Sequence, residues 1–318
     1  MPKDLSAAWK IRNQRWLRFV QANIRAMKDG KAIRLGPSAR PLVAPGAKAG
    51  KGPPLKVVVC SPHPDDEALV GALPLRLRRE CGATVINCAI TLGSNPGQRA
   101  RRLRELKAAC AVLSFDLVVA NPPWGFDHVN LDNRKNHPEE WAAKVRVLSA
   151  VLEKESPDAV IAPHAEDFNT THIGTHYLVA DALGDYLERT GRGPLSFFET
   201  EFWHQNSRPN LMVGVSPEDE AILIMATAEH GGEVRRNPYH LRHPGRMIEN
   251  VRLGAEVVGG QGGAAPDFPF AELYRLVFMV GGNLLAPRPG GRVIGPSEKI
   301  DWQDLLKSFW PQGLEGRG

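Results

Sequence analysis

The stretch Lys56-Val-Val-Val-Cys-Ser-Pro-His-Pro-Asp-Asp-Glu67 decides the fold that we expect for this chain. Its first five residues form an apolar, β-branched run that is typical of a buried strand. After the polar turn, the spacing of apolar residues over 68–80 predicts an amphipathic helix. A strand, a tight turn and a helix in this order place the polar side chains at the carboxyl edge of a sheet, where open α/β sheets bind their ligands.

The polar turn itself carries a candidate metal site. His63 and Asp66 are three residues apart, so both side chains can converge on one metal ion. Asp65 lies between them and can face a water molecule on that metal. The alternative interpretation is a structural turn before a helix whose first residues are acidic. A structural turn has no need of the histidine, and the sequence therefore favours a metal site.

The rest of the central segment alternates between strand and helix patterns. We expect further strands at 83–91, 116–120, 159–163 and 198–203, and helices at 98–113 and 140–155 and from about residue 172 to 188. Repeated strand–helix units favour parallel strands with right-handed crossovers. The predicted fold is therefore a Rossmann-like, three-layer α/β/α domain with a mostly parallel sheet.

A second informative stretch, His164-Ala-Glu-Asp-Phe-Asn-Thr-Thr-His-Ile-Gly-Thr-His176, follows the strand at 159–163. Like the first, it leads from a strand through a polar loop into a helix, so we expect the two loops to lie side by side at one sheet edge. His172 or His176, one helical turn apart, would then approach His63 and Asp66. The alternative interpretation is a capped helix start with Thr170 or Thr171 as the N-cap.

Pro-His-Pro-Asp-Asp-Glu resembles the Ala-His-Pro-Asp-Asp-Glu signature of the PIG-L/LmbE-like zinc N-deacetylases. Those enzymes remove acetyl groups from N-acetylglucosamine-type sugars, and the resemblance extends over roughly residues 55–230. It implies that His172 is the third metal ligand, because His172 matches the second histidine of the family's His-x-x-His. Asn169 stands where the family has the first histidine, and an amide can bind substrate but cannot donate a proton as an acid. His176 is the alternative ligand or the replacement acid.

Weaker matches to the family lie elsewhere in the chain. Arg102, in Arg102-Leu-Arg-Glu105, matches an arginine that reaches toward the sugar, and Glu67 ends the signature; we assign both to substrate binding. His230-Gly-Gly stands where the family often has Ser-Gln. Further on, His240 and His243 are expected at the surface, with the alternative that one of them reaches the site. The glycine-rich run 259–265 is expected to form a turn or a loop over the cleft.

Charge separates the N-terminal segment from the body of the chain. Residues 1–54 contain 12 Lys/Arg and 2 Asp/Glu, a balance of +10, which leaves −5 for the other 264 residues of a chain whose net charge is +5. An acidic body argues against a nucleic-acid substrate. We expect three parts: a basic helix with a Pro/Gly linker at 1–54, a catalytic domain at 55–235, and a C-terminal extension of that domain at 236–318.

The N-terminal segment is expected to form a helix over 4–28 and a linker over 36–54. The helix carries an apolar stripe surrounded by basic residues. Two roles fit this pattern: docking on the core or on a second subunit of a homo-oligomer, and peripheral adhesion to an anionic membrane surface. No apolar run is long enough for a transmembrane segment, and no secretory signal is visible. The four cysteines are expected as free thiols in a cytoplasmic protein.

These observations predict a zinc-dependent hydrolase that releases acetate from an N-acetylated amino sugar or its conjugate. His63, Asp66 and His172 would hold the zinc, which generates hydroxide at neutral pH, and Asp65 would act as general base. The sequence does not distinguish zinc from another divalent cation. Two alternatives remain open: a metal-dependent hydrolase of another bond, such as a phosphoester, and a non-catalytic sugar-binding relative.

Overall fold

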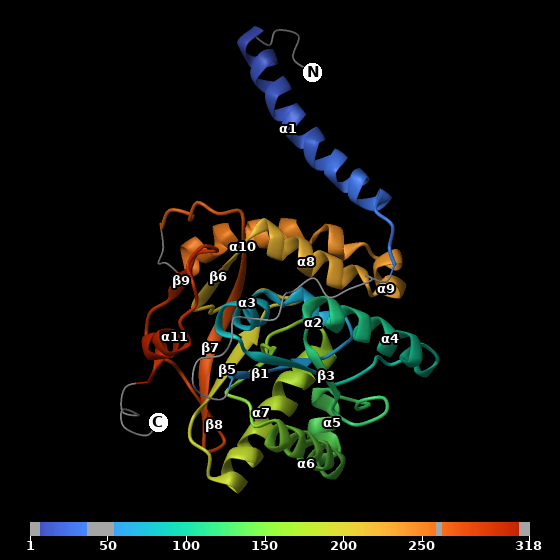
Figure 1. Cartoon of the computed structure of the whole chain (residues 1–318), viewed down its shortest axis with the longest axis vertical. Coiled ribbons are helices and arrows are strands. Elements are labelled where there is room, and N and C mark those ends of the chain that lie inside the picture. Colours follow the sequence, from blue (N-terminus) through green and yellow to red (C-terminus); the bar gives the residue numbers. More distant parts are fainter. Residues whose placement is uncertain (1–6, 37–53, 259–262, 312–318) are drawn as a thin grey trace. The chain divides into compact units, whose positions relative to one another are not determined.

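The computed structural model describes residues 7–36, 54–258 and 263–311 (Figure 1). The predicted linker and most of the glycine-rich run at 259–265 lie outside the described residues. Nine strands form one sheet: β1 (Lys56–Ser61), β2 (Thr84–Ala89), β3 (Asp116–Val119), β4 (Ala159–Pro163), β5 (Leu195–Thr200), β6 (Leu211–Val215), β7 (Phe270–Val280), β8 (Asn283–Leu285) and β9 (Arg292–Ile294).

The strand order is β3-β2-β1-β4-β5-β7-β6-β9, with β8 paired to β7. The first five strands run parallel, and β7 pairs antiparallel with β5, β6 and β8. The predicted Rossmann-like α/β fold with a mostly parallel sheet is confirmed. β1 pairs directly with β4, and the chain order along the sheet reverses between them. Such a switch point leaves a crevice beyond the carboxyl ends of the two strands.

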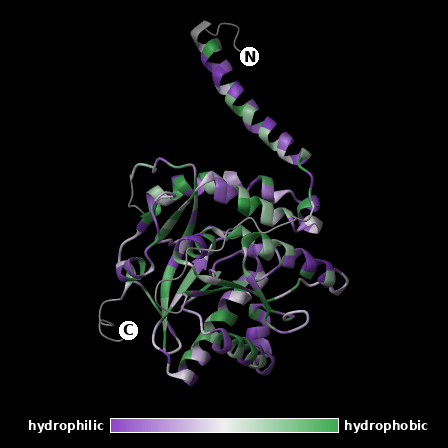
Figure 2. Ribbon diagram, viewed as in Figure 1, coloured by the Kyte–Doolittle hydropathy of each residue, from purple (hydrophilic) through white to green (hydrophobic). Residues whose placement is uncertain are grey.

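Helices cover both faces of the sheet, as Figure 1 shows. They are α2 (Asp66–Leu69), α3 (Ala72–Cys81), α4 (Pro96–Leu113), α5 (Leu131–Asn136), α6 (Pro138–Glu155), α7 (Thr170–Thr190), α8 (Pro217–Ala228), α9 (Gly231–Arg236), the short 3₁₀ helix η1 (Tyr239–Leu241), α10 (His243–Val257) and α11 (Trp302–Phe309). Alternate residues of β1 enter opposite cores: Val57 and Val59 pack with α3, α4 and α8, and Val58 and Cys60 pack with α6 and α7. Figure 2 shows the resulting hydrophobic strands.

The helix expected over 68–80 is interrupted, which corrects the sequence-based prediction. α2 ends at Leu69 and α3 begins at Ala72. A Cβ on Gly71 would lie 2.6 Å from the side chain of Leu223 and 3.0 Å from the carbonyl oxygen of Glu67. Glycine suits this close approach to α8, while the break itself falls at Val70, whose φ and ψ of −124° and 30° are not helical.

The C-terminal residues form part of the sheet itself. β7 lies between β5 and β6, and α10 packs on β6 and β7 through Met212, Val251 and Leu273. β5 ends at Thr200, so Phe202 and Trp203, which were predicted to continue the strand, lie in the loop after it. Residues 236–311 therefore help to build the sheet, in addition to the walls of the site described below.

The chain divides into two compact units, residues 1–36 and 37–318. In the first unit, α1 (Ala7–Ala32) continues four residues past the end of the helix expected at 4–28, whose first three residues lie outside the described residues. Both roles suggested for its apolar stripe remain predictions. Among the residues described, no helix combines the length and hydrophobicity needed to cross a membrane. The four cysteines are free, as predicted, and all but Cys81 are buried.

Candidate metal centre

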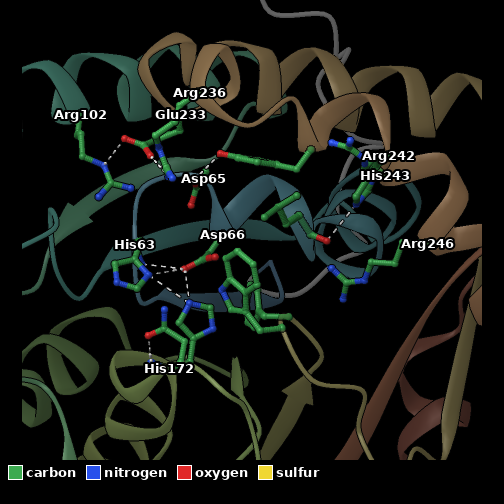
Figure 3. A pocket seen from close by; sticks show the side chains of 15 residues that line it. His63, Asp65, Asp66, Arg102, His172, Glu233, Arg236, Arg242, His243 and Arg246 are labelled. Atoms are coloured by element: carbon green, nitrogen blue, oxygen red, sulfur yellow. Dashed lines mark hydrogen bonds and ion pairs between the residues drawn. The ribbon is translucent and has the colours of Figure 1, made fainter. Parts of the chain in front are cut away.

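Three side chains converge where the loops after β1 and β4 meet. The atoms His63 Nδ1, Asp66 Oδ2 and His172 Nε2 form a nearly equilateral triangle. The histidine nitrogens are 3.2 Å apart, and Asp66 Oδ2 lies 3.5 Å from His63 and 3.4 Å from His172. Figure 3 shows the two rings and the carboxylate directed toward one point.

This triangle fits a tetrahedral metal ion. Zinc holds histidine nitrogen and carboxylate oxygen at about 2.0–2.1 Å, so two ligands in a tetrahedron are about 3.3 Å apart. All three observed edges are within 0.2 Å of that separation. Two imidazoles and one carboxylate are also a usual donor set for catalytic zinc, with a fourth position left for water or substrate.

The backbone after β1 gives Asp66 and Asp65 different partners. The Asp66 carboxylate accepts a hydrogen bond from the backbone N–H of His63 at 2.8 Å, which closes the turn. Asp65 has a φ of 121°, a conformation that costs a non-glycine residue about 1–3 kcal/mol. Its backbone N–H donates to Glu67 Oε2 at 2.9 Å. The strained turn therefore depends on Glu67, which is fully buried.

Glu67 is fixed in turn by His230. His230 Nε2 donates to Glu67 Oε1 at 2.6 Å, and both side chains are fully buried. Since burial opposes the charged imidazole while Glu67 favours it, the net result is a raised pKa for His230. Glu67 does not line the cavity, so the structure does not bring this predicted substrate-binding residue to a position where it touches a ligand.

The loop after β4 presents His172 from the first turn of α7. Asn169 is the N-cap, and its Oδ1 accepts hydrogen bonds from the backbone of Thr171 and His172. The predicted caps, Thr170 and Thr171, are wrong because both lie inside the helix. With Oδ1 committed to the backbone, the Asn169 amide nitrogen is the group that can reach a ligand in the cavity.

Asp167 stands behind His172. Its Oδ1 lies 3.7 Å from His172 Nδ1, which has no hydrogen-bond partner, and its oxygens accept from the backbone of Asn169 and Trp203. A carboxylate behind a ligating histidine orients the ring and raises its basicity. Sequence analysis missed Asp167, although an acidic residue five positions before the ligand was visible.

The charges of the cluster reinforce one another. Burial alone would raise the pKa of Asp66, but the rings of His172 and His63 hold it well below its usual range. Burial opposes protonation of His172, yet the neighbouring carboxylates, Asp66 first, raise its pKa. Burial and the charge of Asp66 raise the pKa of Asp65 to about 7. The carboxylate of Asp66 is therefore held in the ionised form that a metal ligand needs.

His176 lies apart from the triangle. Its Nδ1 donates to the carbonyl oxygen of Pro163 at 2.9 Å, and it does not line the cavity. Burial lowers the pKa of His176 to about 4. The structure therefore brings His172, and not His176, to His63 and Asp66, and it leaves His176 neutral near pH 7.

A cavity of about 350 Å³ opens over the triangle (Figure 3). This volume is in the range of small-molecule sites. Arg102 lines it and donates to the carbonyl oxygen of Pro64 at 3.0 Å, with its side chain lying across Gly93. Phe202 packs edge-on against the His172 ring, with 4.6 Å between ring centroids. Trp203, 64% exposed, also lines the cavity.

The segment 233–246 forms the remaining wall. Tyr239 donates a hydrogen bond from its hydroxyl to Asp65 Oδ2, a contact that no sequence motif indicated. His243 lines the cavity and is buried, and His240 is buried outside it, so the prediction that both are surface histidines is wrong. Both His243 nitrogens face acceptors, Glu220 and the Leu69 carbonyl, which makes the ring a cation within the core.

The fold and the cluster define an α/β protein with a candidate mononuclear metal centre at its topological switch point. Residues 58–183 match the family model described as PIG-L: GlcNAc-PI de-N-acetylase. Comparison with curated protein sequences finds no match.

Solved structures with this fold include a deacetylase from the teicoplanin biosynthesis pathway, 16% identical, with a TM-score of 0.50 over 71% of this chain and 98% of that one. The 4-carboxy-2-hydroxymuconate hydratase GalB of Pseudomonas putida, 15% identical, also has a TM-score of 0.50, over 70% of this chain and 95% of that one. The N,N′-diacetylchitobiose deacetylase of Pyrococcus horikoshii is 16% identical, with a TM-score of 0.48 over 71% and 84%. At these identities the likeness concerns the fold.

The match to the PIG-L family model is confined to the central segment of the chain, residues 58–183. The matched residues contain the loops after β1 and β4 and all three members of the triangle. Tyr239 and the rest of the wall formed by 233–246 lie beyond the matched segment.

Proposed function

We propose that the protein is a metal-dependent N-deacetylase that releases acetate from an N-acetylated amino sugar or its conjugate. The observation that carries the proposal is the triangle of His63, Asp66 and His172 in the floor of a cavity that Asp65 also lines. The match of residues 58–183 to the PIG-L family model supports the reaction type, and the size of the cavity suits a sugar.

His63, Asp66 and His172 would hold one divalent cation, zinc being the best fit to the donor set and spacing. When bound, the metal supplies a Lewis acid for the acetamide carbonyl and lowers the pKa of a coordinated water. Asp167 orients the His172 ring through Nδ1. These four side chains come from two loops on adjacent strands, which fixes their relative positions.

Asp65 is the proposed general base. Its carboxylate lines the cavity next to Asp66 but is not part of the triangle. It takes the proton from the attacking water and returns it to the nitrogen of the leaving amine as the C–N bond breaks. The Tyr239 hydroxyl holds the carboxylate in place, and Glu67 with His230 maintains the backbone conformation behind it.

Arg102 and Asn169 are the proposed sugar contacts. Both line the cavity, and each has N–H groups that can donate to hydroxyl or carbonyl oxygens of a sugar. Glu67 and His176 receive no direct role, since Glu67 is committed to Asp65 and His230, and His176 to Pro163.

Acetate release from a panel of N-acetylated sugars tests the proposal. The protein is stripped with a chelator, reloaded with zinc, manganese or cobalt, and assayed for acetate and free amine, which must appear in equal amounts. We expect turnover only after reloading. Metal binding at one ion per chain without acetate from any sugar would contradict a deacetylase. Binding of about two metal ions per chain would favour hydrolysis of another bond, such as a phosphoester.

A further inference from the structure

Arginine is concentrated in the wall of the cavity. Four arginines line it, Arg102, Arg236, Arg242 and Arg246, although residues 55–318 carry a net charge of −5. In Figure 3 they occupy two places: Arg102 and Arg236 lie near Glu233 on one side of Asp65, and Arg242 and Arg246 lie on the other.

The two groups differ in their partners. Glu233 lies 2.9 Å from Arg236 and 3.9 Å from Arg102, so these guanidinium groups share a carboxylate. Among the residues that the structure describes, no carboxylate lies within 4.0 Å of Arg242 or Arg246. Arg246 donates from Nη2 to the backbone carbonyl of Glu201, which carries no charge, and the buried carboxyl groups of Glu201 and Glu272 act on Arg246 only from beyond ion-pair distance. The positive charges of Arg242 and Arg246 are therefore not balanced by a direct ion pair.

The backbone holds these two arginines close together. Arg242 precedes α10 and Arg246 lies one turn further on, where the backbone N–H of Arg246 bonds to the carbonyl oxygen of Arg242 at 3.1 Å. Residues four apart at the start of a helix project from one face. Both side chains line the cavity that contains the His63, Asp66 and His172 triangle. A ligand held by the arginine pair therefore extends toward the candidate metal centre.

A guanidinium group without a carboxylate partner suits an oxyanion. Its planar N–H groups match the oxygens of phosphate or carboxylate, and charge-assisted bonds of this kind are stronger than those between neutral groups. A neutral sugar would leave the two charges unpaired as it displaced water from the cavity, which carries a free-energy cost. The pair therefore selects by charge as well as by shape.

We propose that Arg242 and Arg246 form a subsite for an anionic group of the substrate, so that the preferred N-acetylated sugar carries a phosphate or a carboxylate besides its acetamido group. The identification of this ligand as a substrate rests on the proposed deacetylase function. The subsite itself rests on the cavity and the arginine pair. Arg102 and Asn169 would contact the sugar, and the arginine pair its charged substituent.

Binding to the metal-free protein tests the subsite without turnover. The probes are N-acetylglucosamine, N-acetylglucosamine 1-phosphate and N-acetylmuramic acid, which are neutral, a phosphomonoester and a carboxylate. Calorimetry with the full chain should give at least about 10-fold tighter binding of one or both anionic sugars. Comparison of the phosphate-bearing and carboxylate-bearing sugars identifies which anion the subsite prefers. Competition by inorganic phosphate shows whether phosphate binds there without the sugar.

Charge-removing variants locate the effect. Arg242→Gln with Arg246→Gln should reduce the preference for the anionic sugar by at least about 10-fold. Arg235→Gln is the matched control, because Arg235 is exposed on nearby α9 but does not line the cavity. Circular dichroism checks that the variants fold; if the double variant does not, each single variant is tested in the same way. Equal binding of the three sugars, or the same loss in Arg235→Gln, would overturn the subsite.

Turnover by the metal-loaded protein separates this proposal from the proposed function. Acetate release with equal kcat/KM for neutral and anionic sugars leaves the deacetylase standing and overturns the subsite. Binding of the anionic sugar that depends on Arg242 and Arg246, without acetate release, leaves the subsite standing and overturns the deacetylase. Acetate release that favours the anionic sugar and loses this preference in the double variant supports both.

Discussion

The floor and the far wall of the cavity are built in different ways. The floor comes from two strand-to-helix loops, 61–66 and 164–172, which follow adjacent parallel strands and contain His63, Asp66 and His172. The wall comes from 233–246, a segment without a recognisable motif that runs from α9 through η1 into the first turn of α10. Only the floor falls within the residues that match the PIG-L family.

This contrast suggests a division of labour. The floor holds the groups that a deacetylation needs, and their positions depend on local backbone geometry at the ends of β1 and β4. The wall contributes Tyr239, Arg242 and Arg246, which can select and orient a substrate. Substitutions in the floor should therefore abolish the reaction, and substitutions in the wall should change its rate or its preference among sugars.

Loss of a metal ligand should have the largest effect. His172→Ala removes one of three ligands, so metal affinity should fall by more than the roughly 10–100-fold typical of losing a group that supports a ligand, and activity should fall with it. Elemental analysis after dialysis measures the metal. His176→Ala is the control on the same helix face and should retain the metal, because His176 is bonded to Pro163. Metal loss in His176→Ala alone would reverse the ligand assignment.

Removal of the proposed general base should have the second-largest effect on activity. Asp65→Asn keeps the size of the side chain but cannot accept a proton, and we expect kcat to fall by about 10²–10⁴-fold. Metal content should stay at the wild-type level, since Asp65 is not part of the triangle. Steady-state acetate release together with elemental analysis checks both statements, and an undiminished rate would eliminate Asp65 as the base.

Tyr239→Phe tests the wall at its contact with the floor. The hydroxyl makes one hydrogen bond to the Asp65 carboxylate, and loss of a bond to a charged group should lower kcat by about 10-fold. Metal content should not change. Tyr177→Phe, a tyrosine on α7 that does not line the cavity, is the control. A drop as large as that of Asp65→Asn would mean that Tyr239 belongs to the reaction chemistry and not only to positioning.

The smallest expected effect is on the pH dependence of stability. Glu272 on β7 is buried against Tyr274 and the backbone N–H of Ala72, and it faces the cations His243 and Arg246. Burial raises the pKa of Glu272 from 4.5 to about 7. The folded state binds the proton of Glu272 more tightly than the unfolded state. The contribution of this group to the free energy of unfolding is therefore fully present below about pH 4.5 and is lost as the pH rises toward 7.

Glu272→Gln should flatten this decline, which we expect to be on the order of 3 kcal/mol for the wild type. Urea unfolding at several pH values between 4 and 8 measures it. His243 contributes in the same direction, since its raised pKa also makes stability fall as the pH rises. If Glu272→Gln keeps the full decline of the wild type, the titration of this carboxyl is not its cause.

Much of the floor could be predicted from the sequence. A β-branched run before His63 and a second before His164 predict two buried strands, and parallel strands bring their following loops to the same edge. The triangle needs only this edge and the spacing of His63, Asp66 and His172 along the chain. The wall could not be predicted in the same way, because Tyr239, Arg242 and Arg246 reach the cavity through the packing of η1 and α10.

Several local predictions failed for a related reason. The pattern of residues 68–80 predicted one helix, but the helix breaks at Val70, next to the point where Gly71 meets α8. His240 and His243 were expected at the surface because they lie in a polar segment, and His243 is instead a buried cation held by Glu220. Periodicity does not reveal a partner that lies far away in the sequence.

The sequence by itself determined the α/β class of this protein and two members of its candidate metal centre, His63 and Asp66, because strand and turn propensities act over a few neighbouring residues. Only the tertiary structure decided that Glu67, held by His230, bonds to the backbone of Asp65, and that His172 rather than His176 joins His63. It also decided that Arg242 and Arg246 stand in the cavity wall without a direct ion pair. Those features depend on side chains from distant segments meeting in a packed interior, and such meetings follow from the shapes and charges of the whole domain.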